Sequence, residues 1–278
     1  MKIIIQDYTT AHSSESRLLY TALQSYKNIE AFFWDVQQNT SSYDLMDSIN
    51  PDFIVLNALG VNKDLLHYFT YNNIGKIAIL KIPNDTTKEQ RQLIDDSEFL
   101  KKHVCLAISE KEMKNVRTVN LNPCVDINIP DMPMQNKIPL CIVANNNNIH
   151  PFLLKLSESF HLISYEQNDV ADIFGPNIRL CGLYHNYDQI VFDGITAFKQ
   201  PFFDALYRSN NVTFCSDDER LIEKSEMLFG QNLSISNKDI DHDSLLNTLK
   251  EKHLPQNRVK QLLSQMPIDQ SIFTEVNK

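Results

Sequence analysis

Short apolar runs alternate with helical segments along this 278-residue chain, and this alternation constrains its fold more than any other feature. The first apolar run, residues 2–6, is followed at 13–16 by capping residues for a helix that continues to residue 26. Parallel strands need a crossover connection between them, and a helix usually supplies it. The sequence therefore predicts an α/β fold in which helices wrap parallel sheets.

The alternation runs through both halves of the chain. In the first half it predicts strands at 2–6, 31–34, 53–56, 76–82, 103–108 and 116–121, and helices at 13–26, 43–49, 63–71, 87–99 and 110–113. In the second half it predicts strands at 140–144, 162–165, 178–181, before Gly194 and before residue 216, and helices at 151–160, 170–174, from about 199, 217–228, 244–252 and 255–266.

A proline-rich segment without strand or helix periodicity separates the two halves. It contains Pro123, Pro130, Pro133 and Pro139, and this composition indicates an interdomain linker. The length of the chain also suits two domains. We therefore expect two Rossmann-like, doubly wound domains at 1–128 and 138–278, joined by a linker at 129–137. Such domains, facing each other across a cleft, would hold a ligand between the carboxyl edges of their sheets.

Composition narrows the classes of partner. The apolar share of 42% and the charged share of 22% are ordinary for a globular protein. A net charge of -9 gives no general attraction to nucleic acid or to anionic lipid, so we do not expect a general nucleic-acid binder.

The five cysteines lack C-x-x-C spacing and sit mostly in apolar runs, as small core residues of a reducing compartment do. With no apolar stretch long enough to span a membrane, we expect a cytoplasmic protein.

The stretch 187–215, YDQIVFDGITAFKQPFFDALYRSNNVTFC, concentrates the signals for a ligand site. It predicts a buried strand broken by Gly194, a loop, a helix beginning near Lys199 and Pro201, and a second strand. Loops that follow the strands of a parallel sheet lie at the edge where ligands bind. Asp204, in the first turns of the helix, is therefore the leading candidate, although a carboxylate there also suits the helix dipole without any ligand.

Three segments resemble GT-B glycosyltransferases of the group 1 or spore-maturation type, with a divergent donor site. Residues 108–133, ISEKEMKNVRTVNLNPCVDINIPDMP, resemble the end of the first domain, where the family has an Asn-Gly-Val-Asp turn and this chain has Asn-Pro-Cys-Val-Asp. Residues 177–194 resemble the strand with a Tyr-x-x-Ala-Asp motif, and residues 201–214 resemble the helix and strand of the donor domain. The resemblance implies a GT-B fold and transfer of a sugar from a nucleotide-sugar donor, with no metal or other cofactor.

The same resemblance implies a set of donor-binding residues in the second domain. Asp204 matches the last acid of a Glu-x7-Glu pattern that binds the ribose hydroxyls, and Thr196 stands where the first acid is expected. Gly194 and Lys199 belong to the same loop. Asn145 and Asn146 replace the basic residues that hold the diphosphate in the family, and Arg179 is a candidate cation.

A catalytic base is harder to assign. His12 follows the first predicted strand and can accept a proton near neutral pH, although a lone loop histidine is more often only exposed to solvent. The family's glycine pair after this strand is missing, and so is its histidine after the fourth strand, where Lys81, Ile82 and Pro83 stand.

These departures leave three functions open. The first is a glycosyltransferase (EC class 2.4) with an unidentified acceptor, such as a glycan, a protein or a modified nucleic-acid base. The second is a catalytically inactive GT-B-like partner or scaffold of an active transferase. A homo- or hetero-oligomer is compatible with either function. A small-molecule binding protein that uses the same cleft is the third candidate.

Overall fold

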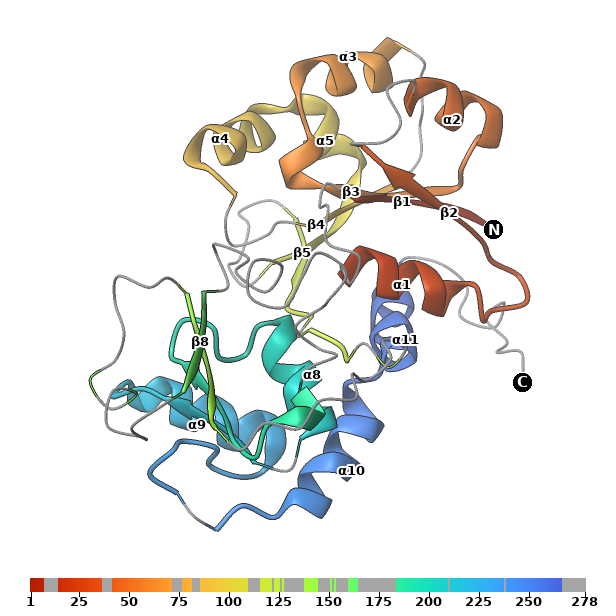
Figure 1. Cartoon of the computed structure of the whole chain (residues 1–278). Helices are drawn as coiled ribbons and strands as arrows, with labels where there is room; N and C mark the ends of the chain where they lie inside the picture. The colour runs from red at the N-terminus through yellow and green to blue at the C-terminus, as the bar shows by residue number, and fades with distance from the viewer. Residues whose placement is uncertain are drawn as a thin grey trace. The chain divides into compact units, whose positions relative to one another are not determined.

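The computed structural model describes residues 1–7, 15–36, 42–71, 77–81, 86–109, 116–121, 123–125, 127, 138–144, 151, 153, 160–164, 184–209, 211–237 and 239–266. The chain divides into two compact units, drawn in Figure 1. Unit 1 comprises Met1–Asn122 and Pro255–Lys278, and unit 2 comprises Pro123–Leu254.

Unit 1 is built on a parallel sheet. Its strands are β1 (Lys2–Asp7), β2 (Glu30–Asp35), β3 (Phe53–Asn57), β4 (Ile77–Lys81), β5 (Val104–Ile108) and β6 (Thr118–Val119). Its helices are α1 (Glu15–Leu23), α2 (Ser42–Ile49), α3 (Lys63–Tyr71), α4 (Lys88–Asp96), α5 (Glu98–His103) and α11 (Pro255–Gln265), with a 3-10 turn η1 at Ala58–Gly60. The strand order β2-β1-β3-β4-β5-β6 and the parallel pairing are those of a doubly wound fold.

Both faces of this sheet are buried, as expected for parallel strands. Ile3 and Ile5 of β1 belong to the core cluster on the side of α1, whereas Ile4 belongs to the cluster that includes Met46 of α2 and Leu65 of α3. Successive side chains of a strand point to opposite faces, so a continuous apolar run supplies two cores at once. This explains why the N-terminal run has no alternation with polar residues.

One predicted helix is interrupted in the structure. The segment expected as one helix at 87–99 forms α4 and α5, because Ser97 ends the first and caps the second by accepting a hydrogen bond from the Leu100 N–H at 3.2 Å. The predicted strand at 116–121 is also shorter, since only Thr118 and Val119 pair with β5. Apolar periodicity alone did not reveal the cap at Ser97.

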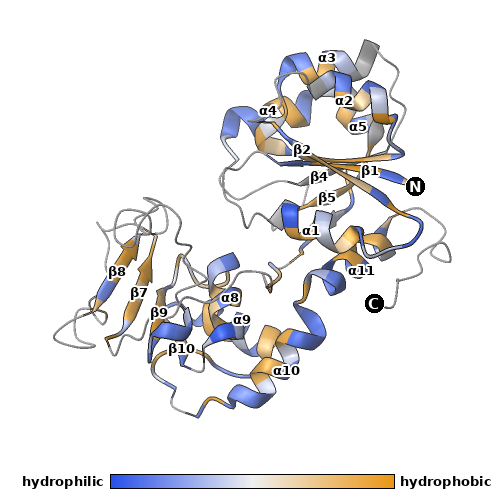
Figure 2. Cartoon of the chain, turned by 45° about the vertical axis from the view of Figure 1, so that its right-hand side comes forward, coloured by the Kyte–Doolittle hydropathy of each residue, from blue (hydrophilic) through white to orange (hydrophobic). Residues whose placement is uncertain are grey.

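The last described helix, α11, belongs to unit 1 rather than to the second domain in which the sequence placed it. Val259, Leu262, Leu263 and Met266 are each no more than 4% exposed and share a core cluster with α1 and β1. Figures 1 and 2 both show α11 beside α1. The sequence of an amphipathic helix does not indicate which sheet the helix covers. The expected second domain, 138–278, therefore included α11, which belongs to unit 1.

Unit 2 contains a second parallel sheet of the same design. Its described strands are β7 (Leu140–Val143), β8 (His161–Ser164), β9 (Ile190–Asp193) and β10 (Val212–Cys215), and its described helices are α8 (Gln200–Arg208), α9 (Glu219–Phe229) and α10 (His242–Lys252), with a 3-10 turn η3 at Tyr184–Asn186. The order is β10-β9-β7-β8, with parallel pairing throughout. The strand predicted at 178–181 and the helix at 170–174 lie outside the described residues, and so does most of the helix at 151–160.

Phenylalanine rings fill the core of unit 2. Phe198, Phe202, Phe203 and Phe229 contact one another with ring centroids 5.2 to 6.4 Å apart, and the buried ring of His253 lies 5.0 Å from Phe203. Figure 2 shows β7 and most of β9 as hydrophobic, and every residue of both strands is buried, including Asp193 at the end of β9. The fold class predicted from the sequence, Rossmann-like units with doubly wound parallel sheets, is therefore confirmed.

Two further expectations concern cysteines and membranes. Cys124, Cys141 and Cys215 are buried and not in disulfide bonds, as expected for small core residues. Across the part of the chain that the structure describes, no helix is both long enough and apolar enough to cross a membrane.

Candidate functional site

The candidate site of unit 2 lies where the strand order changes direction. From β7 the chain leads to β8 on one side of the sheet, and β9 lies on the other side of β7. Ligands of doubly wound folds bind in the crevice outside the carboxyl ends of two such strands. Here these ends are Ala144, directly after β7, and Asp193, the last residue of β9.

The carboxylate of Asp193 joins the two strand ends. Its Oδ2 accepts a hydrogen bond from the Ala144 N–H at 2.8 Å. Its Oδ1 accepts hydrogen bonds from the Ile195 N–H at 3.1 Å and from the Thr196 N–H at 2.7 Å. Asp193 is 5% exposed, and hydrogen bonds to a buried carboxylate are stronger than those between neutral groups. Asp193 therefore positions the loops after both strands.

Thr196 strengthens the same junction. Its hydroxyl lies 2.6 Å from Oδ1 of Asp193 and 3.0 Å from the carbonyl oxygen of Ile142 in β7. The side chain is 1% exposed. The hydroxyl that stands in place of the family's first acid is therefore directed into the chain itself and stabilises the loop. Its predicted contact with a donor stays a prediction.

The loop between β9 and α8 is tightly packed. A Cβ added to Gly194 would lie 2.8 Å from Oγ of Ser216, so the close approach of these two loops requires glycine. Phe198 has a φ of 65°, which is rare for an aromatic residue, and its ring lies in the phenylalanine core. Ile195 is 59% exposed between these fixed points. A rigid loop with one exposed apolar side chain follows β9.

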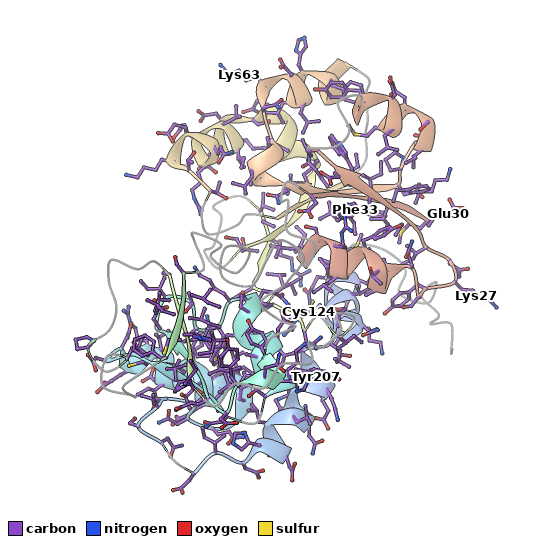
Figure 3. The ribbon with its side chains drawn as sticks, viewed as in Figure 1. Lys27, Glu30, Phe33, Lys63, Cys124 and Tyr207 are labelled. Carbon is purple, nitrogen blue, oxygen red and sulfur yellow. The ribbon has the colours of Figure 1, made fainter. Side chains whose placement is uncertain are left out.

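Helix α8 begins directly after this loop, as the sequence predicts. Lys199 is its N-cap residue and Pro201 lies in its first turn, where the missing N–H costs little. Asp204 is 2% exposed, and its Oδ1 accepts a hydrogen bond from Nε2 of Gln200 at 3.1 Å. The same Gln200 amide donates to the carbonyl oxygen of Cys124, which Figure 3 labels beside α8. Asp204 thus lies where the sequence predicts it, with its carboxylate inside the unit.

A thiol also lies near this edge. Cys215 ends β10 and pairs in register with Asp193 of β9. Burial raises the pKa of Cys215 to about 11, and the negative charges of Asp217 and Asp193 add to this effect. The thiol is therefore protonated near neutral pH and is a packing residue rather than a nucleophile.

Four sequence candidates cannot be placed against this geometry. His12, Asn145, Asn146 and Arg179 lie outside the described residues. Asp193, in contrast, was not singled out from the sequence. An acid at the end of a predicted buried strand, directly before a glycine, is the signal that marks it, because such a position lies at the ligand-binding edge of a parallel sheet.

Comparisons with known proteins find likenesses among solved structures at low sequence identity. No protein-family model matches the chain, and no curated protein does. Among solved structures, the S. aureus MnaA-UDP co-structure is similar with a TM-score of 0.46 at 13% identity, over 94% of both chains. The glycosyltransferase SnogD from Streptomyces nogalater has a TM-score of 0.49 at 12% identity, over 95% of this chain and 99% of SnogD. The lipopolysaccharide outer core galactosyltransferase WaaB has a TM-score of 0.44 at 11% identity, over 95% of this chain and 99% of WaaB.

All three TM-scores lie below 0.5 and all three identities below 25%, so these likenesses carry no conclusion about this chain. Its doubly wound architecture does not give an activity either, because unrelated functions use it. The function of the chain is therefore inferred from its own residues.

Proposed function

We propose that unit 2 binds a nucleotide sugar at the ends of β7 and β9, and that the chain transfers the sugar to an acceptor. The supporting observation is that two of the three segments resembling glycosyltransferases border this edge. The described part of the first segment, residues 184–194, contains β9, and residues 201–214 contain most of α8 and β10. Both therefore border the crevice in which doubly wound folds hold nucleotides.

Asp204 is the proposed ribose ligand. A carboxylate accepts two hydrogen bonds from a pair of ribose hydroxyls, and Asp204 lies in the second turn of the helix that starts at this edge. In the structure its Oδ1 accepts a hydrogen bond from Nε2 of Gln200, so a ribose hydroxyl that donates to this oxygen competes with the Gln200 amide. Catalysis would then rest on holding donor and acceptor in position and on stabilising the departing phosphate.

Isothermal titration calorimetry with UDP, GDP and CDP sugars tests this function. We expect one nucleotide class to bind and the variant Asp204→Asn to lose at least tenfold in affinity. Asp188→Asn is the matched control, because this exposed acid precedes β9 at the opposite end of the strand. If no nucleotide sugar binds the folded protein, the proposed function is wrong.

A second function is favoured by a specific observation. The polar groups at the crevice bond to one another, since Asp193 accepts from three backbone N–H groups and the Thr196 hydroxyl is buried beside it. A site that satisfies its own polar groups suits a catalytically inactive partner of an active transferase. Sugar turnover by the purified chain, lost in Asp204→Asn while the circular dichroism spectrum is unchanged, would exclude this alternative.

A further inference from the structure

We propose that Asp193 acts as the chain's own anion in the crevice of unit 2 and determines how much negative charge a ligand can carry there. The inference rests on the proposed function in one respect, since it takes this crevice as the place of the ligand. It assigns to Asp193 a role in specificity that does not depend on sugar transfer.

The first argument concerns hydrogen-bond donors. Backbone N–H groups after the strands of a parallel sheet are the usual donors to phosphate. In unit 2 the N–H groups of Ala144, Ile195 and Thr196 donate to the Asp193 carboxylate at 2.8, 3.1 and 2.7 Å. Ala144 follows β7, and the other two residues follow β9. One carboxylate thus occupies donors from both sides of the crevice, and a phosphate would have to displace it.

The second argument concerns charge. Asp193 is 5% exposed, so little water screens its negative charge from a ligand in the crevice. The segment 193–199 contains one acid, Asp193, and one basic residue, Lys199, which is the N-cap residue of α8. Within its own loop the formal charge of Asp193 is therefore balanced by Lys199 and not outweighed. Each phosphate added to a ligand increases the repulsion from Asp193.

Asp193→Asn separates the charge from the shape of the side chain. The amide oxygen still accepts hydrogen bonds from Ile195 and Thr196, whereas the amide nitrogen cannot accept from the Ala144 N–H. The substitution therefore removes one negative charge and releases one backbone donor in the crevice. Asp193→Ser, which keeps a small acceptor, is the second variant and serves if the first does not fold.

A titration with inorganic pyrophosphate tests this role without any nucleotide. The backbone amide resonances of Ala144, Ile195 and Thr196 are followed by NMR in the full chain. In the wild type we expect no saturable shift at millimolar pyrophosphate, and in Asp193→Asn a saturable shift of the Ala144 amide. Asp188→Asn, which removes the same charge at the other end of β9, should behave as the wild type. A saturable response of the wild-type amides, or none in either Asp193 variant, would overturn the inference.

Calorimetry with a nucleoside and its mono- and diphosphate, for uridine, guanosine and cytidine, then tests the ligand preference. For the base that binds, we expect wild-type affinity to stay level or fall as phosphates are added, and the affinity of Asp193→Asn for the diphosphate to rise at least tenfold. A tenfold rise from nucleoside to diphosphate in the wild type would contradict the inference. If no member of the series binds any variant, the proposed function fails, and the pyrophosphate titration still decides the role of Asp193.

Discussion

Replacing Leu262 with alanine tests whether α11 belongs to unit 1. Leu262 is 2% exposed and packs in the core cluster that includes Ile5 of β1 and Leu23 of α1. Truncating a buried leucine removes its transfer free energy and leaves a cavity, at a cost of about 2 to 5 kcal/mol. Because the helix packs within unit 1, we expect this loss of stability in unit 1 alone.

Native-state hydrogen exchange measures the two units separately, which a single melting curve of a two-unit chain does not. For a loss of about 3 kcal/mol, the amides of Ile4 and Ile5 should exchange about 150-fold faster, at 1.4 kcal/mol per factor of ten. The amides of Ile142 and Phe192 in unit 2 should be unchanged.

Ser264→Ala is the control, because Ser264 lies on the exposed side of the same helix. Exposed substitutions of this kind change stability by about 0.5 kcal/mol or less. Faster exchange confined to unit 2, or no change in unit 1, would refute the placement of α11.

Three further predictions concern unit 2. Gly194→Ala should destabilise it by about 1 to 3 kcal/mol, measured by native-state hydrogen exchange of unit 2 amides, since the new Cβ lies 2.8 Å from Oγ of Ser216, and Ser216→Gly in the same chain should recover part of this loss. Thr196→Val should cost about 1.5 to 3 kcal/mol because the hydroxyl 2.6 Å from Asp193 is lost, and Thr196→Ser should cost clearly less; equal losses would show that this hydrogen bond is unimportant. Burial raises the pKa of Cys141 from 9.0 to about 12, so above pH 9 the unfolded thiol loses its proton while the native thiol keeps it, and stability falls as pH rises. Cys141→Ala should reduce this fall by up to about 1.4 kcal/mol per pH unit between pH 9 and 10.5, and an unchanged slope would contradict the raised pKa.

Much of the candidate site could be predicted from local patterns. Pro201 and the apolar residues around it indicated the start of α8, and Gly194 indicated the end of β9. Proline and glycine mark the ends of helices and strands through their own backbone preferences, so these ends can be predicted from a few neighbouring residues. The side-chain contacts were not predictable in this way. The hydrogen bond between Asp193 and Ala144 joins residues 49 positions apart, and only the pairing of β7 with β9 brings them together.

The roles of Thr196 and Asp204 show the same limit. Thr196 was a candidate because of its position in a family pattern, and Asp204 also because it lies in the helix after a predicted buried strand, yet burial decides what their side chains contact. Thr196 is 1% exposed and Asp204 is 2% exposed. A pattern of residue types carries no information on exposure within a loop or a helix turn.

The sequence by itself determined that the chain forms two parallel α/β sheets, because the period of apolar residues and the helix caps act over a few neighbouring positions. Tertiary structure alone decided that α11 covers the sheet of unit 1 and that Asp193 occupies backbone donors after β7 and β9 of unit 2. Both depend on contacts between residues far apart in the chain. The free energy of such contacts comes from burial and hydrogen bonding, which exist only once the sheets are assembled.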